Sequence, residues 1–339
     1  MTTTMRAHVL TRYGGPEATE LREVPVPAPG PGELRIRVHA AGLNPVDYKI
    51  REGQLKVIRR YPLPIVLGNE LAGVVDACGP GVARFAPGDR VFARVDKDAM
   101  GAFADYACVA EALVATMPAR LDFAGAAAVP LAGLTALQGL RDELHAAPGQ
   151  RLFIPGGAGG VGTFALQLAK QFGATVATTA SPRGEALVRR LGADVVVDYT
   201  AQRFEEVLSN YDGVFDLVGG DTLARAFAVV KPGGMVLSIA GLPEPLTARK
   251  DLGRGPGLAA LFWVASLGLR LRARRRSARY RYLFMHPSGA DLADLARRID
   301  DGALEVVLDR VVPFAQIGAA FAHLESGRAK GKIVVRMVD

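Results

Sequence analysis

The chain has 339 residues, half of them hydrophobic, with 39 glycines, 21 prolines and a formal net charge of +7. This length accommodates two domains, and the composition favours a well-packed α/β protein and argues against disorder. Cys78 and Cys108 are too few for a disulfide framework, so a reducing, cytoplasmic setting is expected. The first residues lack an apolar core of signal-peptide length, and no apolar run is long enough to predict a membrane span.

The positive charge is concentrated in one segment. Seven arginines, equal in number to the whole net charge, fall within residues 270–281: Arg270, Arg272, Arg274, Arg275, Arg276, Arg279 and Arg281. The basicity is therefore local, and it does not predict a surface-wide footprint for nucleic acid.

The first 130 residues consist of short apolar runs separated by Gly and Pro turns, which predicts a mostly β domain. The clearest strand is 34–38, where apolar and charged residues alternate. Further strands are expected at 71–75, 90–92 and 106–109.

From about residue 130, helical and strand patterns alternate, which predicts a parallel sheet with helices on both faces. Helices are expected at 131–140 and 161–172, and strands at 152–154, 175–178, 195–197, 214–217, 235–239 and 282–285. The chain then returns to mixed elements, with a helix near 290–301 and strands at 306–312 and 333–337. We expect these last elements to complete the first domain.

A glycine-rich turn joins the strand at 152–154 to the helix at 161–172. Gly157, Gly159 and Gly162 have the G-x-G-x-x-G spacing. In such a turn the first glycine permits the tight bend, the second lets a pyrophosphate approach the backbone, and the third lets helix and strand pack closely. The helix N-terminus adds unpaired N–H groups and partial positive charge. The pattern predicts a dinucleotide site; a purely structural glycine turn is the alternative.

The residues after the second strand of this sheet indicate which dinucleotide binds. An NAD site places an Asp or Glu there for the ribose 2′-hydroxyl, yet no acidic residue occurs between Lys170 and Gly184. Ser181 and Arg183 instead suit a 2′-phosphate, which predicts NADP(H). A solvated loop charge is the alternative for Arg183.

Seven segments carry a family resemblance in order along the chain: 40–53, 67–75, 85–93, 127–140, 156–174, 191–199 and 323–335. Through them the sequence resembles the medium-chain dehydrogenase/reductases, in particular their zinc-free quinone-oxidoreductase branch. The resemblance implies a partly open GroES-like β-barrel domain formed by 1–129 and 287–339, a Rossmann domain of 130–286, and an active site in the cleft between them. It also implies a homodimer formed through the exposed edge strand at 282–285.

The sequence departs from the zinc-containing members of that superfamily. Their cysteine is missing from the segment Gly42-Leu43-Asn44-Pro45, and their Gly-His-Glu motif reads Gly68-Asn69-Glu70. None of the five histidines has a ligand-like spacing. We therefore expect no metal site. For Glu70, the alternative to a role in the active site is a structural, hydrogen-bonding role in the barrel.

The resemblance implies hydride transfer to a quinone or an α,β-unsaturated carbonyl, which needs hydrogen-bond donors rather than a Lewis acid. Tyr48 is the expected proton donor, in a loop that also carries Asn44 and Asp47. Asn44 is expected to hold the cofactor ribose or the substrate carbonyl, and Asp47 to orient its neighbours. A core aromatic with a surface hydroxyl is the alternative for Tyr48.

The resemblance also places the cofactor contacts. Thr135 is expected near the nicotinamide phosphate, the glycine turn at the pyrophosphate, and three side chains at the 2′-phosphate. The whole set is Thr135, Gly157, Gly159, Gly160, Val161, Gly162, Ser181, Arg183, Tyr199, Val218, Ala240, Gly241, Leu242 and Lys332. Val218 and residues 240–242 follow the fourth and fifth strands, where the nicotinamide is expected. A strand-end charge is the alternative for Lys332.

Residues 246–281 match the shorter quinone oxidoreductases poorly. Here the run 258–271 is apolar up to its first arginine, and it holds the only tryptophan, Trp263. Three interpretations of this segment stay open: a helix pair that lines the substrate pocket, an interfacial helix on anionic lipid, and a nucleic-acid patch. Nucleic acid is the least favoured of them. A second function also stays open, that of an NADPH-binding regulatory protein whose segment 270–281 contacts membrane or nucleic acid.

Overall fold

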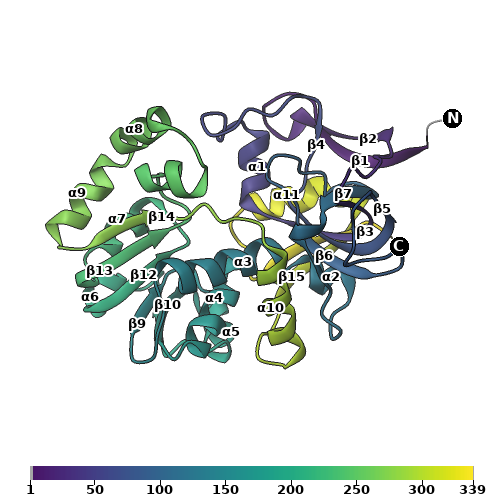
Figure 1. The fold of residues 1–339 in the computed structure, drawn as a ribbon. Coiled ribbons are helices and arrows are strands. Elements are labelled where there is room, and N and C mark those ends of the chain that lie inside the picture. Colours follow the sequence, from purple (N-terminus) through teal and green to yellow (C-terminus); the bar gives the residue numbers. More distant parts are fainter. Residues whose placement is uncertain (1–2, 339) are drawn as a thin grey trace. The chain divides into compact units, whose positions relative to one another are not determined.

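A computed structural model describes residues 3–338 of the chain (Figure 1). It divides into two compact units, one formed by Thr135–His286 and the other by the described residues on either side of that segment. Helix α3 (Pro130–Gln138) carries the chain from one unit into the other. None of the helices in residues 3–338 has the length and apolar character needed to cross a bilayer.

The flanking unit is built on β-sheets, as the sequence predicts. Its larger sheet has the order β15 (Leu308–Pro313), β16 (Lys332–Arg336), β3 (Glu33–Leu43), β5 (Glu70–Cys78), β6 (Arg90–Arg94) and β8 (Val114–Thr116), with β7 (Tyr106–Ala110) paired to β3. A smaller sheet has the order β2 (Thr19–Pro25), β1 (Thr4–Leu10) and β4 (Ile65–Val66). The alternation along 34–38 is explained by burial, because Leu34, Ile36 and Val38 are all in the core.

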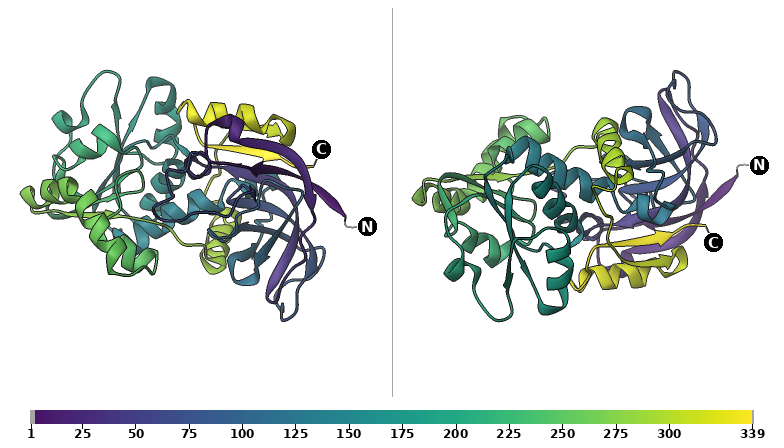
Figure 2. Two further views of the ribbon diagram at one scale, coloured as in Figure 1. Left: turned by 90° about the horizontal axis from the view of Figure 1, so that it is seen from above. Right: turned by 90° about the horizontal axis from the view of Figure 1, so that it is seen from below.

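The C-terminal part of the chain completes this unit, as expected. Strand β16 runs antiparallel to β3, pairing Ile333 with Leu43 and Val335 with Ala41. In Figure 2 the yellow C-terminal strand accordingly lies among the purple and blue strands of the N-terminal part. The helices of the unit are α1 (Pro45–Arg51), α2 (Phe123–Ala127), α10 (Gly289–Asp300) and α11 (Ile317–Glu325), with 3-10 turns at Pro16–Ala18, Glu111–Leu113 and Phe314–Gln316.

The central unit has a six-stranded parallel sheet of the doubly wound type. Its order is β11 (Val195–Asp198), β10 (Thr175–Ala180), β9 (Arg151–Ile154), β12 (Tyr211–Asp216), β13 (Val230–Ser238) and β14 (Arg279–Tyr282). Numbered along the chain, this order is 3-2-1-4-5-6, the arrangement that binds dinucleotides at the carboxyl ends of its strands. The expected Rossmann sheet is therefore confirmed.

The helices of the central unit alternate with these strands (Figure 1). They are α4 (Gly160–Gln171), α5 (Pro182–Arg190), α6 (Phe204–Val207), α7 (Gly220–Ala226), α8 (Pro256–Ala265) and α9 (Leu267–Arg275), with π-helical turns at Gly139–Glu143 and Thr247–Asp251.

Three sequence expectations need correction. The last strand is β14, three residues earlier than 282–285, although it does lie at the sheet edge. Within that strand Arg281 is buried, because it pairs with Glu143, Glu244 and Asp251; it therefore does not belong to the exposed basic cluster. The third correction concerns the expected loop that carries Tyr48, which is helix α1.

Candidate active site

The glycine turn between β9 and α4 is held against the neighbouring strand β10. The Gly156 N–H donates to Thr179 Oγ1 at 3.0 Å, and the Gly157 N–H donates to Thr178 Oγ1 at 3.1 Å. Gly156 has a φ of 81°, in the left-handed region that favours glycine. Two threonine hydroxyls and one positive-φ glycine thus fix the position of the turn.

The three motif glycines differ in what surrounds them. A Cβ at Gly157 would lie 2.2 Å from Thr178 Oγ1, and a Cβ at Gly162 would lie 2.4 Å from the Gly156 carbonyl oxygen. These two glycines are needed for close packing of the turn. A Cβ at Gly159 would meet only the Gly156 oxygen, at 3.4 Å, so this residue borders open space.

Helix α4 begins at that open space. Gly159 is its N-cap in an extended conformation, and no side chain caps the helix there. The Gly160, Val161 and Gly162 N–H groups belong to the first turn, which has no intrahelical acceptors. Uncapped donors and the positive end of a 12-residue helix fit the pyrophosphate of a dinucleotide.

The side chains expected at the 2′-phosphate follow neighbouring strands. Ser181 and Arg183 come directly after β10, and Tyr199, which is 62% exposed, comes directly after β11. The segment 181–183 is not a loop: Ser181 is the N-cap of α5, and Arg183 lies in its first turn. Ser181 Oγ makes no capping bond, and Arg183 is exposed with no ion pair within residues 3–338. A cation at a helix N-terminus is unfavourable, and a bound phosphate would offset that cost.

The two loops expected at the nicotinamide are joined by a buried pair that the sequence analysis missed. Ser238 Oγ donates to Asp216 Oδ2 at 2.6 Å, while Asp216 accepts the Gly219 N–H and Ser238 Oγ accepts the Gly241 N–H. Burial raises the pKa of Asp216. The pair holds together the loops after β12 and β13, which carry the exposed side chains of Val218 and Leu242.

Val218 also approaches the glycine turn, since a Cβ at Gly156 would lie 3.0 Å from Val218 Cγ2. Residues after three neighbouring strands, β9, β12 and β13, therefore gather at one edge of the sheet. Ala240 and Gly241 are held there by Ser238. Thr135 belongs to the same unit and is buried in α3.

The flanking unit contains a buried polar cluster around Asn44 and Glu70. Lys332 Nζ donates to Glu70 Oε1 at 2.6 Å, to the Leu43 carbonyl at 3.0 Å and to Asn44 Oδ1. Asn44 Nδ2 donates to the same Glu70 oxygen at 2.6 Å, and the Leu131 N–H donates to Glu70 Oε2. Lys332 and Asn44 are 3% exposed and Glu70 is fully buried, so Lys332, although it begins β16, is not a plain solvated charge at a strand end.

Asp47 extends the cluster. Its carboxylate accepts the Asn44 backbone N–H at 2.8 Å and Asn69 Nδ2 at 2.6 Å, and its complete burial raises its pKa from 3.8 to about 7. Asp47 and Asn44 together form the capping box of α1. Asp47 therefore orients Asn44. Glu70 has the structural hydrogen-bonding role weighed for it from the sequence, and Asn69 is the partner that sequence reasoning did not assign.

Tyr48 lies in helix α1, and its side chain is half-buried against the core. Its hydroxyl has no hydrogen-bond partner among the described residues. Burial, with Glu52 and Glu325 nearby, raises the pKa of the phenol. The side chain is thus protonated at neutral pH and has a free donor.

The donor set of this cluster does not fit zinc. Its carboxylates, Asp47 and Glu70, are engaged by amides and by Lys332, and neither cysteine nor histidine accompanies them. Among residues 3–338, no group of three or more His, Cys, Asp or Glu side chains is placed to hold a metal ion.

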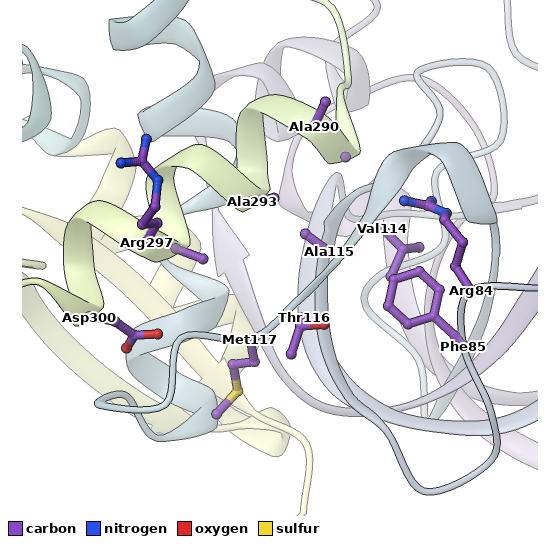
Figure 3. Close-up of a pocket in the computed structure, with 12 residues that line it drawn as sticks. Arg84, Phe85, Val114, Ala115, Thr116, Met117, Ala290, Ala293, Arg297 and Asp300 are labelled. Atoms are coloured by element: carbon purple, nitrogen blue, oxygen red, sulfur yellow. The ribbon is translucent and has the colours of Figure 1, made fainter.

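One open hollow of about 540 Å³ lies in the flanking unit, between β8 and α10. Figure 3 shows Val114, Ala115 and Thr116 on one side and Ala290, Ala293 and Arg297 on α10. None of the expected site residues lines it, and most of its lining side chains are small.

A doubly wound sheet with a glycine turn, combined with a β unit that the C-terminal strand completes, defines a two-domain dehydrogenase. Family models match both parts: an alcohol dehydrogenase GroES-like domain at residues 30–119 and a zinc-binding dehydrogenase model at residues 191–335. The chain belongs to the medium-chain dehydrogenase/reductase superfamily, and the expected combination of a GroES-like and a Rossmann domain is confirmed.

Individual relatives are similar over almost the full chain. A chloroplastic NADPH-dependent alkenal/one oxidoreductase of Arabidopsis thaliana is 37% identical, covering 98% of this chain and 79% of that protein. The quinone oxidoreductase of Coxiella burnetii has a TM-score of 0.86 at 30% identity, covering 99% of this chain and all of that one. A mycobacterial protein solved in complex with NADPH has a TM-score of 0.82 at 28% identity, covering 98% of this chain and 100% of that one.

Proposed function

We propose that this protein is an NADPH-dependent oxidoreductase that transfers hydride to a quinone or an α,β-unsaturated carbonyl without zinc. The observation that carries the proposal is the uncapped N-terminus of α4 at Gly159, together with the unpaired Ser181 and Arg183 at the start of α5, after the neighbouring strand β10. NADPH dependence and these acceptor classes appear in the names of the relatives, and an NADPH complex is known for one solved neighbour.

We assign the cofactor residues on this geometry and, for Thr135, on the family resemblance. The turn at Gly157–Gly162 takes the pyrophosphate, and Ser181, Arg183 and Tyr199 surround the 2′-phosphate. Val218 and residues 240–242 border the nicotinamide, on loops that Asp216 and Ser238 hold in place. Thr135 contacts the nicotinamide end of the cofactor from α3. When bound, NADPH supplies the hydride.

The remaining chemistry concerns the negative charge that forms on the acceptor oxygen. Such a charge is stabilised by fixed donors in a site with little water, and it then needs a proton. Tyr48 supplies the proton donor, because its phenol is protonated and unpartnered. Asn44 is assigned to the acceptor carbonyl or the ribose; because its amide is engaged by Glu70 and Lys332, it must exchange one of these hydrogen bonds to bind either group. Solvent can also protonate an enolate, so Tyr48 accelerates the reaction without being indispensable.

Lys332 acts as a positioning residue. Its ammonium group has three donors, and all three are taken by Glu70, Leu43 and Asn44. A direct cofactor contact would break one of these buried bonds. We therefore propose that Lys332 acts on the cofactor through Asn44, whose amide it fixes.

The experiment is a turnover assay with NADPH, in which the loss of its absorbance is followed with a panel of quinones and enals. Turnover on at least one class is expected, with Tyr48→Phe reducing kcat and leaving NADPH affinity unchanged. Tight NADPH binding without turnover on any acceptor would contradict the proposal and favour a regulatory protein. Reduction of NADP⁺ by simple alcohols would contradict the acceptor class.

We also propose that the protein is a cytoplasmic homodimer. Among the described strands, the edge strand β14 pairs with β13 alone, so its other side can extend the sheet in a second copy. Cys78 and Cys108 are free thiols, consistent with a reducing compartment. Sedimentation equilibrium tests the first point: a monomer at micromolar concentration would refute the dimer.

A further inference from the structure

Helices α8 and α9 present an outer surface that the proposed reaction does not use. It consists of the side chains of Leu261, Trp263, Val264, Leu271, Arg272, Arg274, Arg275 and Arg276, and is called the α8–α9 face below. The two helices follow one another along the β14 side of the sheet, and α9 packs against β14 (Figure 1). The helices are separated at Ser266, whose hydroxyl donates to the Phe262 carbonyl at 2.7 Å.

The part of the α8–α9 face that comes first along the chain is apolar. The inner sides of the helices are anchored by Ala259, Phe262 and Ala273, which are buried. The outer side leaves Leu261 49%, Trp263 50%, Val264 65% and Leu271 45% exposed. Single exposed apolar side chains are common on proteins, but four large ones on two short consecutive helices are the composition expected of an interaction site.

The second part of the face is strongly basic. Arg272, Arg274, Arg275 and Arg276 are all exposed, and none of them forms an ion pair with another described residue. The sequence contains no Asp or Glu between residues 252 and 290. Arginines on other helices of this protein do find partners, as Arg189 does with Glu185 and Arg298 with Asp294. The four charges are therefore without an ion-pair partner in the part of the chain that the structure describes.

Trp263 links the two parts. The Arg270 guanidinium lies over its ring, 4.8 Å from the centroid, and Arg270 is only partly exposed. This contact holds the ring at the border between the apolar and the basic side chains. Tryptophan at such a border, with arginines beside it, is the arrangement of helices that lie in a membrane interface.

We propose that the α8–α9 face docks onto an anionic lipid surface. Leu261, Val264 and Leu271 enter the outer acyl region, Trp263 lies among the headgroups, and the four arginines contact lipid phosphates. A second copy of the chain fits less well, because a symmetric contact would bring the two arginine clusters together. Nucleic acid would satisfy the arginines but would leave the apolar side chains without a partner. The docking is independent of the proposed reaction.

The protein carries its own probe, since Trp263 is its only tryptophan. The full chain is titrated with vesicles of phosphatidylglycerol and phosphatidylcholine, and with vesicles of phosphatidylcholine alone. With the anionic vesicles the Trp263 emission is expected to shift to shorter wavelength, and the protein is expected to float with the vesicles. With neutral vesicles neither change is expected, and high salt weakens the binding.

Two variants separate the basic and apolar parts of the face. Replacing Arg272, Arg274, Arg275 and Arg276 by Gln lowers the vesicle partition coefficient by about 100- to 1,000-fold, because each basic side chain near an anionic surface contributes about fivefold. Replacing Leu261 and Val264 by Ser lowers the partition coefficient and reduces the emission shift. Both variants keep the Trp263 probe.

A matched control removes the same charge from the other unit, by replacing the exposed arginines Arg12, Arg22, Arg37 and Arg328 by Gln. This variant is expected to bind vesicles about as well as the parent chain. Equal losses in the two arginine variants would overturn the proposal, because binding would then follow net charge alone. Absence of flotation at low salt, binding to duplex DNA but not to vesicles, or a change of oligomeric state in the Leu261/Val264 variant would overturn it as well.

Discussion

Replacing Gly159 by alanine separates the cofactor function of the glycine turn from its structural function. The residue has φ −79°, which alanine adopts without strain, and the added Cβ would meet only the Gly156 oxygen, at 3.4 Å. Alanine is a poorer N-cap than glycine, which destabilises the protein, but it lowers the conformational entropy of the unfolded chain, which stabilises the protein. Each effect is below about 1 kcal/mol, and the two have opposite signs. The variant should therefore unfold within about 3 °C of the parent.

The cost of Gly159→Ala should instead appear in cofactor binding. The new methyl group occupies the open space in front of the uncapped N–H groups of α4. Losing one hydrogen bond to a charged phosphate costs about 1.5–3 kcal/mol, or roughly 10- to 150-fold in the NADPH dissociation constant. Calorimetric titration with NADPH measures this value directly.

Gly162→Ala is the matched comparison, because its Cβ would lie 2.4 Å from the Gly156 carbonyl oxygen. Overpacking of this kind costs about 1–3 kcal/mol, which lowers the melting temperature of a unit of this size by roughly 2–12 °C. Unchanged NADPH affinity in a well-folded Gly159→Ala variant would refute the assignment of this turn as the phosphate site.

Three further outcomes follow from the site. Arg183→Gln should reduce the preference for NADPH over NADH by about tenfold or more, without changing the melting temperature, since Arg183 is exposed and unpaired; an unchanged preference would remove it from the 2′-phosphate site. Lys332→Met should destabilise the protein by about 3–5 kcal/mol, because it leaves Glu70 buried without its cation, and adding Glu70→Gln should recover part of that loss in urea unfolding. Burial raises the pKa of Asp47 from 3.8 to about 7, so the native state holds a proton that the unfolded chain releases. The free energy of unfolding should therefore fall by up to about 4 kcal/mol as the pH rises from about 4 to 7, and Asp47→Asn should remove this dependence.

The fold was predictable because local patterns determine it. The alternation along 34–38 and the buried runs at 152–154 and 214–217 reveal strands directly, and the G-x-G-x-x-G spacing places the turn between a strand and a helix. Boundaries were less certain where polar residues are buried. Strand β14 reads Arg-Tyr-Arg-Tyr, which has no apolar signal, and its Arg281 is buried only because three distant carboxylates neutralise it.

The polar framework of the site was predictable only in part. Asn44 and Lys332 were singled out separately, yet they are 288 residues apart and meet only because β16 pairs with β3. No local pattern reveals such a contact. The Asp216–Ser238 pair was missed for the same reason, since it depends on the register between β12 and β13. The helical state of residues 45–51 did have a signal, because Asn44, Pro45 and Asp47 form an N-cap sequence that the family expectation of a loop obscured.

The central claim is that the turn at Gly157–Gly162 and the residues Ser181 and Arg183 form an NADPH site. Calorimetric titration of the purified chain with NADPH and with NADH tests it most directly. One NADPH should bind per chain, more tightly than NADH, and the preference should decline as ionic strength rises. Failure to bind either dinucleotide, or tighter binding of NADH, would contradict the account.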